Sequence, residues 1–170
     1  FAAAAKMCRC EPCESDHPLF VSYTSGSTGK PKGVVHGHGG YVSGVLQSMR
    51  TVFECVPGEG ADGEFGGILT VGSAGWITGQ SYMLMGPLLA AVRSVVMVGS
   101  PVFPTPLRMI QTVQREKCTL LKTGSAVVRQ LMTDPGNAAK VDAVDTSTLR
   151  CATFCAEPVS VEVHKYSHDH

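Results

Sequence analysis

The stretch "SYTSGSTGKPKGVVHGHGGY" (Ser22–Tyr41) follows an apolar run and is rich in groups that bind anions. It holds six glycines, five serine or threonine hydroxyls and two lysines. Glycines let backbone NH groups approach an oxyanion closely, and hydroxyls and ammonium groups add donors and charge. The stretch therefore predicts a loop that holds phosphate, with the positive end of the next helix pointing the same way.

Strand and helix patterns alternate about five times around this loop. Expected strands are 18–25, 68–73, 94–99, 118–124 and 148–156, and expected helices are 38–53, 79–93, 125–134, one after Pro106 and one after Pro158. Gly86-Pro87 is expected to bend the second helix or to start a new one. This alternation predicts an α/β fold, a mostly parallel sheet flanked by helices. Ligands of such sheets bind beyond the carboxyl ends of the strands, where we expect 22–41, 73–78 and 156–158.

The composition argues against a nucleic-acid-binding protein and against a membrane-spanning one. The 170 residues are 44% apolar and 16% charged with a formal net charge of zero, which is typical of a globular domain without affinity for nucleic acid. No apolar run approaches the roughly 20 residues of a membrane span. The seven cysteines are scattered and odd in number, which favours a reducing compartment, the cytoplasm, with an organelle as the alternative.

The N-terminal residues 1–17 are interpreted as an irregular, cysteine-rich lead-in, and residues 18–170 as one partial domain. Cys8, Cys10 and Cys13 are closely spaced, but no second cysteine pair follows at the spacing of a zinc site, so no metal site is predicted. Both ends of the chain lack the features of a natural terminus, and a piece of a longer protein is expected.

"YTSGSTGKPKGV" (Tyr23–Val34) resembles the signature phosphate loop of the adenylate-forming enzymes, which include acyl-CoA synthetases, luciferases and peptide-synthetase adenylation domains. Four ordered blocks are similar to the acetyl-CoA synthetase branch: residues 16–41, "GWITGQSYMLMGPLL" (75–89), residues 101–132 and "LRCATFCAEPVS" (149–160). The resemblance covers most of the chain from about Cys10 onward. It implies part of the large N-terminal domain of such an enzyme.

This resemblance implies ATP-dependent activation of a short carboxylate, acetate, to an acyl adenylate and its transfer to CoA, with Mg²⁺ bound to the phosphates. The expected partners are the small molecules acetate, ATP and CoA, without nucleic acid or membrane; no oligomeric state is predicted. Propionate or acetoacetate is the alternative acid. A degenerate nucleotide-binding homologue without turnover is the alternative function, and a phosphate-binding structural domain unrelated to ligases is a third.

Site residues follow from the same resemblance. The phosphate loop (23–34) supplies Thr24, Ser25, Gly26, Ser27, Thr28, Gly29, Lys30, Lys32 and Gly33, with Lys32 and Thr28 in the catalytic role. Other cofactor-binding residues are Thr78 of the acyl-pocket block (75–82) and Ala156, Glu157 and Pro158 of the nucleotide-proximal segment (155–158). Trp76, Ile77, Thr78 and Cys155 are implied to wall the acyl pocket, with a plain core role as the alternative for Trp76.

The sequence departs from the family pattern at four places: Ser73 for Asp, Gln80 for His, Gly124-Ser125-Ala126 for Ala-Pro-Thr, and Ala156 for Gly. The methyl group of Ala156 is expected to be tolerated only if φ at that residue is negative. Together these changes favour a divergent family member with altered substrate choice.

Overall fold

The computed structural model describes residues 10–25, 29–60 and 66–170. The chain divides into two compact units, residues 1–44 and 45–170. The expected division between residues 17 and 18 stays a prediction.

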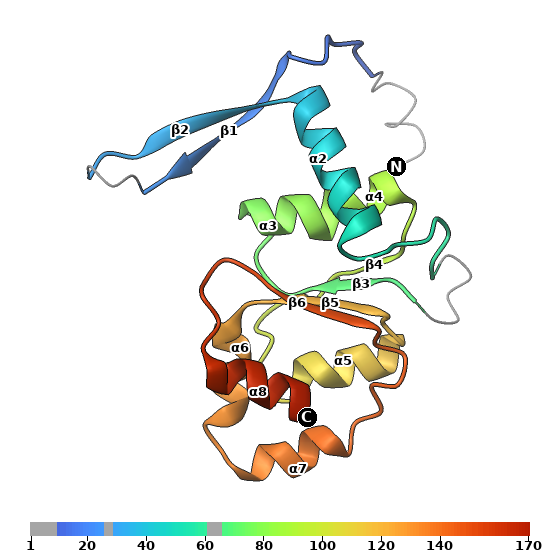
Figure 1. The fold of residues 1–170 in the computed structure, drawn as a ribbon, viewed down its shortest axis with the longest axis vertical. Helices are drawn as coiled ribbons and strands as arrows, with labels where there is room; N and C mark the ends of the chain where they lie inside the picture. Colours follow the sequence, from blue (N-terminus) through green and yellow to red (C-terminus); the bar gives the residue numbers. More distant parts are fainter. Residues whose placement is uncertain (1–9, 26–28, 61–65) are drawn as a thin grey trace. The chain divides into compact units, whose positions relative to one another are not determined.

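The first unit contains an antiparallel hairpin of β1 (Pro18–Thr24) and β2 (Lys32–Gly37), with Thr24 opposite Lys32 at its tip (Figure 1). The second strand of this hairpin was not predicted, whereas the helix expected over 38–53 is confirmed. The loop joins two strands, and α2 (His38–Thr51) begins only after β2. The β-branched pair Val34-Val35 extends the chain here and pairs with β1.

The second unit is built on a four-stranded parallel sheet in the order β4-β3-β5-β6. Its strands are β3 (Ile68–Thr70), β4 (Ser94–Val95), β5 (Leu120–Thr123) and β6 (Cys151–Phe154). This confirms the predicted α/β class. The expected strand over 94–99 is shorter than predicted, because β3 offers only three residues and pairs with β4 at two positions.

Side chains of the sheet alternate between two cores. Leu69 and Leu121 pack on one side with buried residues of α5 (Arg108–Glu116), including Val113. Ile68 and Leu120 pack on the other side, in a cluster that also holds Met49 and Phe53. The sheet is therefore covered on both faces, as its near-continuous apolar strands predict.

The apolar segment 77–90 forms three consecutive pieces: α3 (Ile77–Gly79), a π-helical turn η1 (Gln80–Met85) and α4 (Gly86–Ala90). A new piece therefore begins at Gly86-Pro87, as expected. A side chain at position 86 would lie 2.7 Å from the Ser81 carbonyl oxygen, so a glycine is required there.

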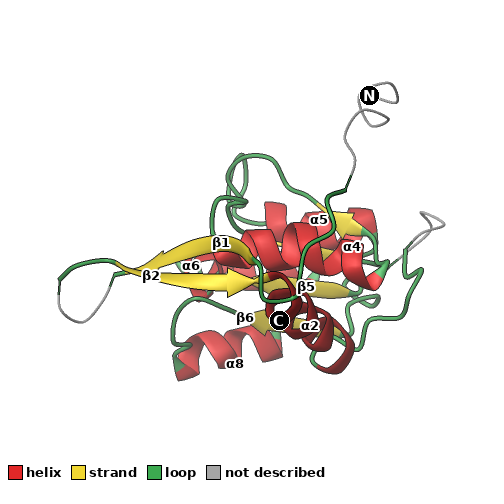
Figure 2. Ribbon diagram, turned by 90° about the horizontal axis from the view of Figure 1, so that it is seen from above, coloured by secondary structure: helices red, strands yellow, loops and turns green. Residues whose placement is uncertain are grey.

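The remaining helices are α6 (Ser125–Met132), α7 (Gly136–Asp142) and α8 (Val161–Asp169), all labelled in Figure 1. Figure 2 shows α6 and α8 in red. Helix α7 was not predicted, because the helix over 125–134 was expected to end near Pro135-Gly136. Among the described residues, no helix combines the length and the apolarity that crossing a membrane requires.

Candidate active site

A cavity of about 400 Å³ lies in the second unit, at the carboxyl edge of the parallel sheet. Segments that follow β3, β5 and β6 contribute its lining residues, which are Val71, Gly72, Ser73, Trp76, Thr78, Gly79, Gly124, Cys155, Ala156 and Glu157. The fold thus brings together the predicted acyl-pocket block and the predicted nucleotide-proximal segment. This is the edge at which α/β sheets bind their ligands.

Trp76 is a wall residue of this cavity and not a core residue, since 72% of it is exposed. Its backbone NH donates to the Ser73 carbonyl oxygen at 3.1 Å, which folds the loop tightly before α3 begins. A side chain at Gly79 would clash with the same carbonyl, so the tight loop depends on that glycine. Thr78 lines the cavity, whereas Ile77 is not among its lining residues.

Ser73 stands where related enzymes were expected to carry Asp. Its hydroxyl oxygen accepts a hydrogen bond from the Gly75 backbone NH at 3.2 Å. The side chain of Gln80, which replaces an expected His, donates to the Ala74 carbonyl oxygen. Ser73 and Gln80 therefore both form hydrogen bonds within segment 73–80, and these bonds stabilise its conformation.

Cys155 and Ala156 continue the chain beyond β6. The Cys155 NH donates to the Thr123 carbonyl oxygen at 3.0 Å, so the pairing of β5 with β6 reaches the cavity wall. Ala156 then adopts φ = +73°, in the left-handed region that glycine enters without cost. The condition under which its methyl group was expected to be tolerated is therefore not met, and the residue is strained.

The substitution Ala156→Gly is expected to raise the free energy of unfolding by about 1 kcal/mol, because glycine relieves the left-handed strain. Denaturant titration of the full-length protein would measure the change. The matched control is Ala152→Gly, at an extended position of β6, which is expected to destabilise by about 0.5–1 kcal/mol. A loss of stability in both variants would contradict the assigned backbone strain.

Glu157 points toward the start of α6 rather than standing free. Its Oε1 accepts a hydrogen bond from the Ala126 NH at 2.7 Å, and its Oε2 lies 3.4 Å from Nη1 of Arg129. Hydrogen bonds from the Ser125 hydroxyl and the Ala126 NH hold the pKa of the Glu157 carboxyl below its usual value. Pro158, also expected near the nucleotide, is not among the residues that line the cavity.

The phosphate loop belongs to the first unit. Thr24 and Lys32 face each other where the hairpin ends, and Lys30 and Lys32 are exposed. Gly29 has φ = +80°, a conformation that explains one glycine of the motif. Exposed lysines, the hydroxyls of Thr24 and Ser25 and a left-handed glycine suit a phosphate chain. The predicted residues Gly26, Ser27 and Thr28 lie outside the described residues.

Gly33, the last predicted member of the loop, allows close packing within the hairpin. A side chain there would lie 3.0 Å from Cγ1 of Val21 and 3.3 Å from the ring of Tyr23. Further along β2, the ring of His36 stacks on Phe20 at 4.7 Å between centroids. These contacts hold the two strands together below the loop.

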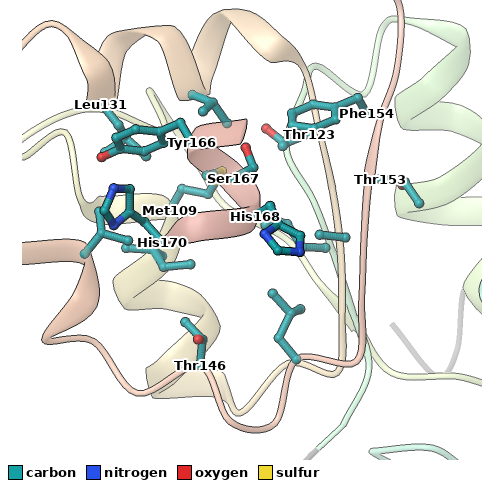
Figure 3. Close-up of a pocket in the computed structure, with 16 residues that line it drawn as sticks. Met109, Thr123, Leu131, Thr146, Thr153, Phe154, Tyr166, Ser167, His168 and His170 are labelled. Carbon is teal, nitrogen blue, oxygen red and sulfur yellow. The ribbon is translucent and has the colours of Figure 1, made fainter. Parts of the chain in front are cut away.

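The further cavities of the second unit include one beside the first and one among the helices. One of about 480 Å³ shares Val71, Gly72, Ser73 and Gly124 with the first and extends to Met97, Gly99, Pro101 and Val127. The other, of about 270 Å³, lies among the helices that include α5 and α8, where the Tyr166 ring packs on His170 at 4.7 Å (Figure 3). None of the predicted site residues lines the cavity of Figure 3. Among the described residues, no group of three or more potential metal ligands comes together.

The fold and the cavity define an α/β protein with a cavity at the carboxyl edge of its parallel sheet, the edge at which proteins of this class bind ligands. The sequence profile of the family described as "AMP-binding enzyme" matches residues 2–169, and the chain belongs to this family.

Curated relatives include the acetyl-coenzyme A synthetase of Salmonella typhi, 36% identical over 92% of this chain and 22% of the relative. The acetyl-coenzyme A synthetase of Cupriavidus metallidurans is 38% identical over 95% of this chain and 24% of its own length. Among solved structures, acetoacetyl-CoA synthetase from Streptomyces lividans matches 94% of this chain and 23% of its own with a TM-score of 0.75 and 28% identity. The chain thus spans about a fifth to a quarter of the length of these relatives.

Proposed function

We propose that the full-length protein activates a short carboxylic acid with ATP and transfers the acyl group to CoA. The observation that carries this proposal is the cavity in which Trp76 and Thr78 meet Cys155 and Ala156. These residues come from segments about 80 positions apart that correspond to the acyl and nucleotide segments of acetyl-CoA synthetases. The family membership and the relatives named as acetyl-coenzyme A synthetases support it.

In the proposed reaction, an oxygen of the acid attacks the α-phosphorus of ATP and pyrophosphate leaves. Lys32, the hydroxyls of Thr24, Ser25 and Thr28 and the backbone NH groups of the loop would hold the β- and γ-phosphates and stabilise their charge. Mg²⁺, bound to the phosphates, would supply further charge neutralisation. The CoA thiol then attacks the acyl carbon, and AMP leaves.

Trp76, Thr78 and Cys155 would form the wall against which the acyl group lies. The small thiol side chain at position 155 is compatible with a short acyl group.

The six described cysteines, among them Cys155, are all free, which supports a reducing compartment, the cytoplasm, as the place of action.

The test of this function is acid-dependent exchange of pyrophosphate into ATP by the full-length protein, followed by thioester formation with CoA. Acetate, propionate, butyrate and acetoacetate are compared by kcat/KM, and acetate or propionate is expected to lead. Acetoacetate is the second candidate, because a solved relative carries the name acetoacetyl-CoA synthetase. If no acid supports exchange, the alternative of a homologue without turnover replaces this proposal.

The substitution Trp76→Gly is expected to shift the preference from acetate toward butyrate by about ten-fold in kcat/KM. Opening the wall makes room for two methylenes, each contributing about 0.8 kcal/mol when buried. The melting temperature is expected to change little, because 72% of Trp76 is exposed.

Trp76→Phe, which keeps an aromatic wall, serves as the matched control and is expected to retain the original order of acids. A Trp76→Gly protein that melts far below the wild type, with the order of acids unchanged, would assign Trp76 to structural support instead.

A further inference from the structure

Three residues of α6 and one residue of the loop after β6 form a charged network beside the cavity. The Ala126 NH donates to Oε1 of Glu157 at 2.7 Å. Nη2 of Arg129 donates to the Ser125 hydroxyl at 2.7 Å, and its Nη1 lies 3.4 Å from Oε2 of Glu157. The contacts of Glu157 bridge 31 and 28 positions of sequence, so they join the loop after β6 to a helix that is distant along the chain.

Glu157 caps the N-terminus of α6. The residue before α6 is Gly124, which has no side chain to cap the helix. The first NH groups of a helix need acceptors, and a carboxylate at this end also interacts favourably with the helix dipole. Glu157 meets both needs from another loop, while Arg129 and the fully buried Ser125 lie one turn apart on the same helix.

Each anchor of the network adjoins a residue of the cavity wall. Gly124 precedes Ser125, and Ala156 precedes Glu157. Both Gly124 and Ala156 line the cavity. Ala156 is held at φ = +73°, a strained conformation that persists only where its surroundings determine it. Ala156 lies between two fixed points, the hydrogen bond of the Cys155 NH to the Thr123 carbonyl oxygen and the contacts of Glu157.

We propose that Arg129 is a positioning residue of the active site. It acts through Glu157 and Ser125 to fix the position of Ala156 relative to Gly124, two residues that line the cavity. This role rests on the proposed function. Arg129 is about half exposed, with 47% of its side chain accessible, and exposed ion pairs contribute little to folding. Its effect is therefore expected in the binding of a ligand that touches both walls, rather than in stability.

The experiment compares wild type, Arg129→Met, Arg129→Lys and Glu157→Gln in the full-length protein. Calorimetry measures the Kd of AMP and of its propyl ester, an unreactive probe that carries both a nucleotide and a short acyl-like chain. Arg129→Met is expected to bind the propyl ester about ten-fold more weakly, with a smaller change for AMP alone. Arg129→Lys is expected to recover most of the affinity, and Glu157→Gln, which keeps an acceptor for the Ala126 NH, to fall between the two.

Arg115→Met is the matched control, because this arginine of α5 is 70% exposed and pairs with Glu116. It is expected to leave both Kd values unchanged. Hydrogen exchange at the Ala126 NH provides a second readout, expected to accelerate about ten-fold in Arg129→Met and to stay at the wild-type rate in Arg115→Met.

Equal affinity of wild type and Arg129→Met for the propyl ester would overturn the positioning role and leave the proposed function intact. A lower melting temperature with unchanged Kd values would do the same, since it would show structural support only. If Arg129→Met does not fold, an unchanged Kd of Glu157→Gln for the propyl ester would also overturn it. A wild type that binds neither AMP nor its ester would refute the proposed function, and the positioning role would fall with it.

Discussion

Replacing Lys32 with alanine in the full-length protein is expected to weaken the binding of Mg²⁺–ATP by about 10- to 100-fold. Lys32 is exposed at the end of the hairpin, opposite Thr24, so its ammonium group is accessible to a phosphate. A hydrogen bond to a charged group contributes about 1.5–3 kcal/mol, which corresponds to this loss of affinity. Calorimetry at two salt concentrations would measure it, and the wild-type affinity is expected to fall more steeply with salt.

Lys140→Ala provides the control for this experiment. Lys140 lies on α7 in the second unit, with 56% of its side chain exposed and Asp134 at 3.6 Å. Its replacement is expected to leave the affinity for ATP unchanged. If Lys32→Ala and Lys140→Ala bind ATP equally well, Lys32 has no contact with the phosphates and the catalytic role proposed for it is wrong.

The sequence predicted the position of the phosphate loop but not the hairpin that carries it. The glycines, hydroxyls and lysines of the loop can be identified directly from the sequence, and Gly29 does adopt the left-handed conformation that a glycine permits. The hairpin was missed because a short apolar pair such as Val34-Val35 fits the start of a helix or a strand equally well. Pairing with β1, which decides between them, depends on residues on the far side of the loop.

Resemblance located half of the residues that line the cavity, whereas the hydrogen bonds and ion pair around Glu157 could not be predicted from the sequence. Trp76, Thr78, Cys155 and Ala156 were predicted and do line one cavity. Arg129 was not predicted, because its contact with Glu157 follows from the parallel pairing of β5 with β6, which sets the two loops side by side. The four-residue spacing from Ser125 to Arg129 was the one local signal that could have indicated it.

Lys122 presents a different case, in which a charge lies where the strand pattern predicts an apolar side chain. It is only 8% exposed on β5, and its Nζ lies 4.5 Å from the centroid of the Tyr82 ring and 5.3 Å from that of Phe53. Burial lowers the pKa of the Lys122 ammonium group below its ordinary value of 10.5. Cation–π interactions with the two rings compensate for part of the hydration that the ammonium group loses on burial. None of the ion pairs found among the described residues includes Lys122, so the burial of its charge is not offset by a carboxylate there.

The substitution Lys122→Met is therefore expected to raise the free energy of unfolding by about 2 kcal/mol at neutral pH, because an apolar side chain of similar length replaces a buried cation. The folded state releases its proton at a lower pH than the unfolded chain, whose lysine titrates near 10.5. Between these two pKa values the unfolded state binds more protons, so the stability of the wild type rises with pH in that window. The advantage of Lys122→Met is thus complete below the folded pKa and shrinks as the pH approaches 10.5.

Denaturant titrations of the full-length protein at pH 7, 8, 9 and 10 would follow both effects. Lys165→Met is the control, because 72% of that side chain is exposed on α8. It is expected to change stability by less than about 0.5 kcal/mol at each pH. A Lys122→Met protein that is less stable than the wild type at pH 7 would show that the contacts with Tyr82 and Phe53 outweigh the cost of burying the charge. A stability difference that stays constant from pH 7 to 10 would contradict the lowered pKa.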